Sequence, residues 1–87
     1  MLKNSDVATA FLRKEKKMVH SANLISTGNT LISYNTVIAQ WQGSDLIGNA
    51  TKYSTTSSRH MYYVRKYVDI WTTKPVPRGT QNLMHYL

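Results

Sequence analysis

The residues with the clearest chemical potential form a short basic and aromatic series. The series consists of Arg59, Tyr62, Arg65 and Lys66. Projected onto an α-helix, these side chains lie on one side of it. Lysine and arginine neutralise phosphates, while tyrosine stacks on bases or forms hydrogen bonds, and this combination is usual where binding is not sequence-specific. The series therefore predicts a helical face that binds a polyanion.

A helix that carries this face is expected to begin in the hydroxyl-rich run 54–58. The side chains that could accept hydrogen bonds from its first turn are those of Thr55, Thr56, Ser57 and Ser58. The opposite side of the helix is apolar and is formed by Met61, Val64, Val68 and Trp71, with His60 and Tyr67 beside them. Because Pro75 and Pro77 bias the preceding residues toward extended structure, the helix should stop by about Thr72. The pattern places Val64 and Trp71 in the core.

A second basic group follows a short helix expected over 7–12, for which Ser5 is a plausible N-cap and Asp6 a first-turn acid. The cations of this group are Arg13, Lys14, Lys16 and Lys17. Such a run usually forms a solvated helix end, because cations complement the C-terminal dipole. Contact with a polyanion is the alternative.

The middle of the chain is β-like. Three strands are expected, over 18–26, 31–42 and 46–53, with turns at 27–30 and 42–45 and a weakening at Gly48. The strand over 31–42 carries bulk on both faces, which is typical of a central strand. The predicted fold class is α+β, with a three-stranded antiparallel β-meander packed by one C-terminal amphipathic helix and a short N-terminal helix.

The composition indicates one small domain. The 87 residues divide into a basic N-terminal segment (1–17), a β-β-β-α core (18–71) and a proline-containing tail (72–87), whose apolar end is expected to fold back on the sheet. The absence of cysteine excludes disulfides and thiolate chemistry and favours the cytoplasm. No membrane span or signal peptide is expected. A net charge of +7 favours nucleic acid or an acidic protein surface as partner.

The sequence argues against catalysis. The four acids, Asp6, Glu15, Asp45 and Asp69, are widely separated, which is poor material for a paired-carboxylate site. The histidines, His20, His60 and His85, lack metal-ligand spacing. We therefore expect a protein that is not an enzyme and that has neither a metal nor a cofactor.

Two segments carry a resemblance to a known group of proteins. The strand Leu31-Ile32-Ser33-Tyr34-Asn35-Thr36-Val37-Ile38-Ala39, followed by 51–60 with its Ser/Thr-rich run and Arg-His pair, resembles a pattern in small proteins of phages and prophages, most of them uncharacterised. The resemblance covers roughly 31–68. It implies a phage accessory protein acting in the host cytoplasm, and it implies no reaction.

Two further functions remain open from the sequence. The same helical face could dock on a host enzyme or defence complex as an inhibitor, since tyrosine and arginine are also preferred at protein interfaces. Alternatively, an anionic small molecule could bind at a helix N-terminus in a pocket between protomers of a homo-oligomer. The residues suited to that third role are Ser57, Ser58, Arg59 and His60. Cap chemistry alone would also account for the hydroxyl run.

Overall fold

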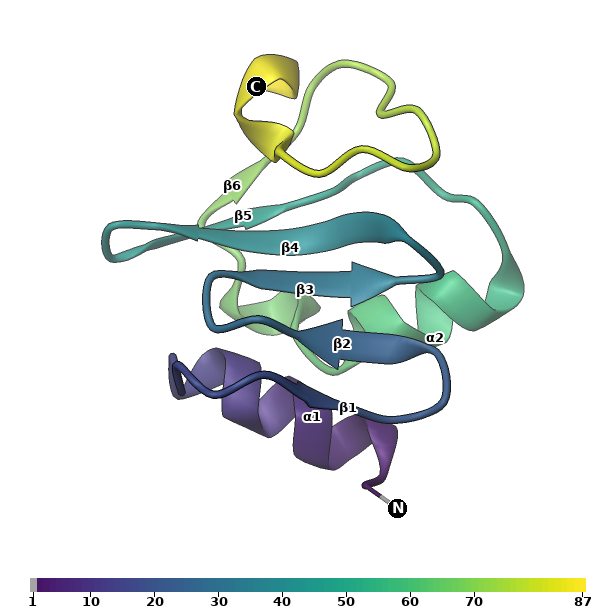
Figure 1. Cartoon of the computed structure of the whole chain (residues 1–87). Coiled ribbons are helices and arrows are strands. Elements are labelled where there is room, and N and C mark those ends of the chain that lie inside the picture. The colour runs from purple at the N-terminus through teal and green to yellow at the C-terminus, as the bar shows by residue number, and fades with distance from the viewer. Residues whose placement is uncertain (1) are drawn as a thin grey trace.

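The centre of the computed structural model is one six-stranded sheet in the order β1-β2-β3-β4-β5-β6, shown in Figure 1. The structure describes residues 2–87, so residue 1 of the predicted domain lies outside it. The strands are β1 (Val19–His20), β2 (Leu24–Ser26), β3 (Thr30–Ser33), β4 (Thr36–Gln42), β5 (Asp45–Gly48) and β6 (Ile70–Trp71). The helices are α1 (Asn4–Leu12) and α2 (Thr55–Tyr62), with 3-10 turns η1 (Arg65–Tyr67) and η2 (Leu83–Tyr86). The α+β class is confirmed.

The predicted three-stranded meander is wrong in its number of strands. The strand expected over 31–42 is divided into β3 and β4 by a two-residue hairpin turn, in which Tyr34 has φ 49° and Asn35 has φ 70°. Two-residue hairpin turns of type I′ require positive φ at both central residues, and a tyrosine rarely adopts it, so the turn has little sequence signature. The strand expected over 18–26 is likewise a hairpin of β1 and β2. The strand expected over 46–53 ends at Gly48.

A β-bulge in β4 changes which side chains face the helices. Leu31 pairs with Ala39, but its neighbour Ile32 pairs with Val37, which leaves Ile38 as an extra residue. As a result Ile38 and Ala39 both join the core beneath the helices, whereas Val37 faces the other side of the sheet. Regular alternation along a strand over 31–42 would place Ile38 and Ala39 on opposite faces, and the bulge places both on the helix face.

The second helix is shorter than the sequence predicts. It begins at Thr55 but ends at Tyr62, and the chain then passes through η1 into β6, where it pairs in parallel with β5. Asp69 explains the change of course, because its backbone N–H donates to the Leu46 carbonyl and its carboxylate accepts from the Leu46 N–H, each over 2.8 Å. The N-cap of α2 is Ser54 rather than a residue of 55–58, since its hydroxyl accepts from the Ser57 N–H.

The two faces of the sheet carry separate apolar clusters. On the helix face, α1 contributes Val7 and Phe11, and the link between α2 and η1 contributes Val64; all three are fully buried. The placement of Val64 in the core is therefore confirmed. Trp71 was also expected there, and that expectation is wrong because Trp71 lies on β6 and is 42% exposed. The difference follows from the early end of α2.

The proline-containing tail covers part of the opposite face, as Figure 1 shows for its yellow end above β4. Val76 and Leu83 are buried against Val37 and Ile47. The Leu83 N–H also donates to the Gln40 side chain at 2.7 Å. The expectation that the tail packs on its own sheet is confirmed.

The first helix begins one residue earlier than its predicted cap. Lys3 is the N-cap residue, and its backbone N–H donates a hydrogen bond of 3.0 Å to the Asp6 carboxylate. Ser5, the expected cap, lies within the first turn and accepts through its carbonyl from the Thr9 hydroxyl. Within residues 2–87, no helix has both the length and the apolar character needed to cross a membrane.

Candidate functional site

Most of the predicted binding face lies along a groove between α1 and η1. We call this the tyrosine groove; it encloses about 400 Å³. It is lined by Ser5, Ala8, Thr9, Leu12, Tyr62, Tyr63, Arg65, Lys66 and Tyr67. Tyr62 and Tyr67 are 63% and 49% exposed, so their rings are accessible to a ligand. The structure thus brings together Tyr62, Arg65 and Lys66 and adds two tyrosines that the sequence reading did not assign to the face.

Each cation of the groove lies over a tyrosine ring. The Arg65 guanidinium carbon is 4.8 Å from the Tyr62 ring centroid, and Lys66 Nζ is 5.2 Å from the Tyr67 centroid. At exposed sites such contacts contribute only about 0.5–1 kcal/mol. Their consequence is positional, because they hold a positive charge and an aromatic ring side by side.

Arg59 occupies a different position from the other members of the series. It is exposed on α2, three residues before Tyr62, and is not among the residues that line the tyrosine groove. Because the helix ends at Tyr62, Arg59 and Arg65 do not share one continuous helical face. Arg59 can therefore add positive potential near the groove without forming its wall.

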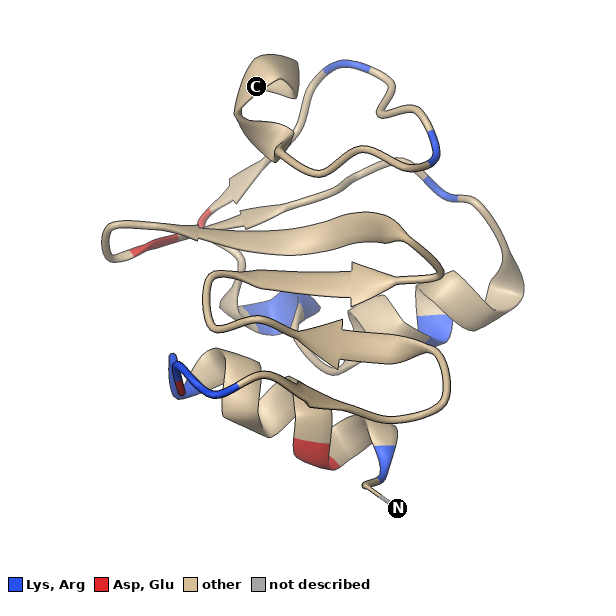
Figure 2. Ribbon diagram, in the orientation of Figure 1, with Lys and Arg blue, Asp and Glu red and all other residues tan. Residues whose placement is uncertain are grey.

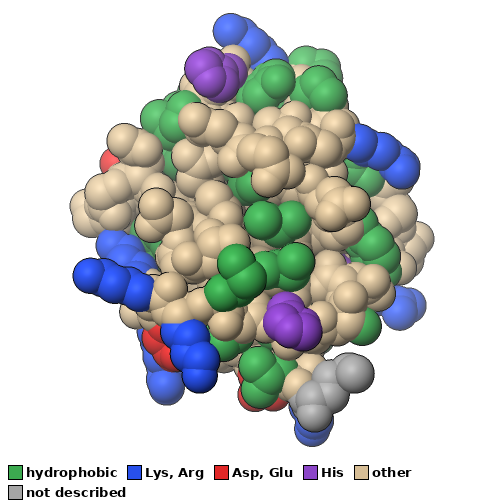
Figure 3. Space-filling model, viewed as in Figure 1, with side chains coloured by type: hydrophobic (Ala, Val, Ile, Leu, Met, Phe, Trp, Pro, Cys, Tyr) green, Lys and Arg blue, Asp and Glu red, His purple; other side chains and the backbone are tan. Residues whose placement is uncertain are grey.

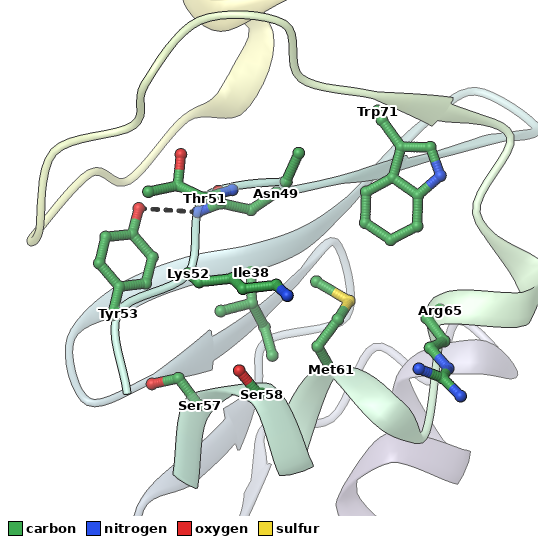
Figure 4. A pocket seen from close by; sticks show the side chains of 11 residues that line it. Ile38, Asn49, Thr51, Lys52, Tyr53, Ser57, Ser58, Met61, Arg65 and Trp71 are labelled. Carbon is green, nitrogen blue, oxygen red and sulfur yellow. Dashed lines mark hydrogen bonds between the residues drawn. The ribbon is translucent and has the colours of Figure 1, made fainter. Parts of the chain in front are cut away.

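A second cavity, of about 270 Å³, lies on the other side of Arg65 and is shown in Figure 4. We call it the Trp71 cavity. Its lining consists of Ile38, Asn49, Ala50, Thr51, Lys52, Tyr53, Ser57, Ser58, Met61, Arg65 and Trp71. Trp71 and Tyr53 stand at opposite ends in the view, with the α2 side chains Ser57, Ser58 and Met61 along one side. Arg65 lines both this cavity and the tyrosine groove.

Hydrogen bonds between two distant segments fix the wall of the Trp71 cavity. The Thr72 hydroxyl accepts from the Ala50 N–H, and the Thr51 hydroxyl accepts from the Val76 N–H, each over 2.9 Å. Asn49 is buried, and its amide donates to the Val37 carbonyl and to the Tyr53 hydroxyl. The segment 49–53 is thereby attached both to the sheet and to the tail.

The basic run after α1 is partly engaged in structure. Lys14 adopts φ 56°, donates to the Gly43 carbonyl at 3.0 Å and lies 4.3 Å from the Trp41 ring centroid. Arg13, Lys16 and Lys17 are exposed, and Lys16 lines a separate hollow beside Trp41. Leu12, at the end of the tyrosine groove, directly precedes this run.

The residues of the proposed anionic-ligand site are divided between surface and core. Ser57 and Ser58 line the Trp71 cavity, whereas Arg59 and His60 do not. His60 is 2% exposed; its Nδ1 lies 2.6 Å from the Ser33 hydroxyl and its ring stacks on Tyr34 at 5.7 Å. Burial lowers the pKa of His60 below its ordinary value, because desolvation disfavours the imidazolium form. His60 thus supports the Tyr34 turn from beneath.

The hydroxyl–imidazole pair of Ser33 and His60 has the composition of a nucleophile and its base. Ser33 is only 1% exposed, so its hydroxyl is almost closed to solvent. No group of three potential metal-ligating side chains occurs in the part of the chain that the structure describes.

The sequence did not indicate that the two hollows would also be lined by Lys52, Tyr63, Tyr67 and Trp71. Trp71 was placed in the core because a continuous helix would have turned it inward, and only the parallel pairing of β6 with β5 brings it to the surface. Lys52 had no periodic signal because it lies in an irregular segment.

Comparison with protein-family models finds no match for the chain, and comparisons with curated proteins and with solved structures find none either.

Proposed function

We propose that this protein binds nucleic acid through the tyrosine groove, with Arg65 and Lys66 as phosphate ligands and Tyr62 and Tyr67 as base-stacking surfaces. The observation that carries the proposal is the pairing of each cation with an exposed tyrosine ring. Cations that track a backbone and aromatic rings that receive bases are the two parts of a surface for single strands.

The distribution of acids supports an attractive potential at the groove. Asp69 accepts a hydrogen bond from the Leu46 N–H, and Asp6 accepts from Lys3 at the start of α1. None of the four acids lines the tyrosine groove. Figure 2 shows the cations of η1 and α2 behind the sheet and a second basic segment at the end of α1. With a net charge of +7, the protein should attract polyanions at long range.

The face of the sheet opposite the helices is less suited to binding nucleic acid. Figure 3 views that face, and its lysine and arginine side chains lie around the margin instead of over the middle of the sheet. A nucleic-acid surface needs cations beside its stacking groups. The helix side of the molecule meets that requirement, because Arg65 and Lys66 lie beside three tyrosines.

Inhibition of a host protein by the same surface is the second candidate. The observation that favours it is the cluster of exposed Tyr62, Tyr63 and Tyr67 beside Arg65, since tyrosine and arginine dominate the binding energy of many protein interfaces. An origin as a phage accessory protein, which the resemblance of 31–68 implies, suits either function. In both cases the protein is a binding module without catalysis.

The dependence of binding on salt separates the two candidates. The test is a titration of a labelled 12-nucleotide single strand at several salt concentrations, followed by fluorescence anisotropy. The logarithm of affinity should fall linearly with the logarithm of salt concentration, by roughly 0.7 per phosphate contact for a single strand. Absence of binding at low salt would contradict nucleic-acid binding and leave the inhibitor as the better account.

A further inference from the structure

We infer that the Trp71 cavity receives one unpaired base of a bound single strand, with Arg65 holding the phosphate between that base and the next. The inference rests on the proposed nucleic-acid function and adds a specific subsite to it. It also specifies a single strand as the ligand, because a base inside a duplex cannot enter a cavity without leaving its stack.

The Trp71 ring has the properties of a fixed stacking surface. It is 42% exposed, and on its inner side it rests on Gly48, where a Cβ atom would lie 2.8 Å from ring atoms Cε3 and Cζ3. The following residue, Thr72, is buried and donates its N–H to the Gly48 carbonyl at 2.9 Å. Since the ring is held on one side and open on the other, a base can stack on it with little ordering cost.

The size and lining of the cavity suit a base. Its volume of about 270 Å³ is just below the range of about 300–1,000 Å³ usual for drug-sized ligands. Ile38 and Met61 supply apolar surface, while Ser58 supplies a hydroxyl for the polar edge of a base. Lys52 and Arg65 add positive charge at the same cavity, which suits the phosphates that flank a base bound there.

Arg65 connects this cavity to the tyrosine groove. It lines both hollows, and its guanidinium lies over the Tyr62 ring. A phosphate bound at Arg65 would therefore have Trp71 on one side and Tyr62 on the other. Two successive bases of a single strand can occupy these two surfaces, whereas a rigid duplex cannot present unstacked bases to both.

Fluorescence of Trp71 reports directly on the subsite. The chain has two tryptophans, and a Trp41→Phe background leaves Trp71 as the only one. In that background a single-stranded 12-mer should quench the emission, whereas a duplex of the same sequence should quench little. Anisotropy on the same samples should show the single strand bound at least about tenfold more tightly than the duplex, because only the single strand gains the stacking on Trp71.

Three variants test the subsite independently of phosphate binding. Trp71→Leu should weaken single-strand binding about 5- to 150-fold, the range expected for loss of one stacked base, and leave duplex binding unchanged. Trp71→Phe should restore most of the loss. Ser58→Leu, which fills the cavity and keeps Trp71, should weaken the single strand and abolish quenching. Ile70→Ala, at the neighbouring exposed position of β6, is the matched control and should have no effect.

The outcomes distinguish the subsite from the proposed function. The subsite would be overturned if the single strand bound the Trp41→Phe protein without quenching Trp71 and bound Trp71→Leu and Ser58→Leu as tightly as the parent protein, while loss of binding on charge reversal of Arg65 and Lys66 would still support the groove. Equal affinity for single strand and duplex would also overturn the subsite. If no nucleic acid binds at any salt concentration, both fail together. Circular dichroism confirms that each variant is folded.

Discussion

Gly48 lies directly beneath the ring of Trp71. A Cβ atom at position 48 would lie 2.8 Å from Trp71 Cε3, and equally close to Val68 Cγ1. The absence of a side chain at Gly48 is therefore what allows the parallel strand β6 to approach β5 and to present an aromatic ring at the surface. The same contact fixes the orientation of the proposed base-stacking surface.

Gly48→Ala should destabilise the fold by about 1–3 kcal/mol, because the added methyl group must displace Trp71 and Val68. Urea unfolding measures the change. In a Trp71→Ala background the cost should be smaller, since one of the two obstacles is gone. An equal cost in both backgrounds would show that the ring does not rest on Gly48.

Ser54→Ala should cost about 1 kcal/mol through loss of the N-cap of α2. For a domain of this size the melting temperature should fall by about 4–8 °C. Thr56→Ala is the matched control, because Thr56 is an exposed hydroxyl residue of the same turn that does not cap the helix, and it should change the melting temperature little. A larger effect at Thr56 would place the start of the helix elsewhere.

Leu83→Ala should destabilise the protein by about 2–5 kcal/mol, because Leu83 is fully buried between the tail and the sheet. Leu87→Ala removes the same side chain from a position that is 37% exposed and should cost much less. Equilibrium denaturation of both variants provides the comparison. Similar small effects would mean that the tail does not pack on the sheet in solution.

Acid should destabilise the fold through His60. Its pKa is lowered in the folded state by burial, so in the acid range the unfolded chain binds more protons than the folded one. The contribution of His60 to the free energy of unfolding should be complete above the unfolded pKa of about 6.5, and it should decrease as the pH falls below that value. Melting temperatures between pH 8 and 5 measure this. A His60→Gln variant should show a weaker dependence, and identical pH profiles would contradict the assignment.

The fold class was predictable from the sequence because it depends on local patterns. Each of these patterns involves only residues that are close together in the sequence. They are the turn at Gly43, the hydroxyl run at the start of α2 and the apolar stripe around Val64. The same holds for the apolar tail, where the composition of 83–87 indicated burial.

The features that the sequence could not predict depend on contacts between distant segments. Tyr34 adopts positive φ in the turn between β3 and β4, and its ring stacks on the ring of His60, which lies 26 positions further along the chain. α2 ends early because Asp69 pairs with the backbone of Leu46. The Arg65–Tyr62 pair could be anticipated from its spacing, but the Lys66–Tyr67 pair could not, because a continuous helix would have turned Tyr67 toward the apolar side. The Trp71 cavity could not be anticipated either, since it exists only after β6 pairs with β5.

The most direct test of nucleic-acid binding is charge reversal in the tyrosine groove against a matched reversal elsewhere. The double variant Arg65→Glu/Lys66→Glu changes two exposed side chains of η1, whereas Lys3→Glu/Lys74→Glu makes the same change in net charge at exposed positions outside the groove. Anisotropy with a labelled single strand at low salt is the measurement. We expect the groove variant to lose at least about 100-fold in affinity and the control to lose a few-fold, because in the proposed complex only the groove cations contact phosphates. Equal losses of affinity in the two variants would show that only the net charge of the protein matters. Retention of affinity by the groove variant would contradict the assignment and point instead to the basic run after α1.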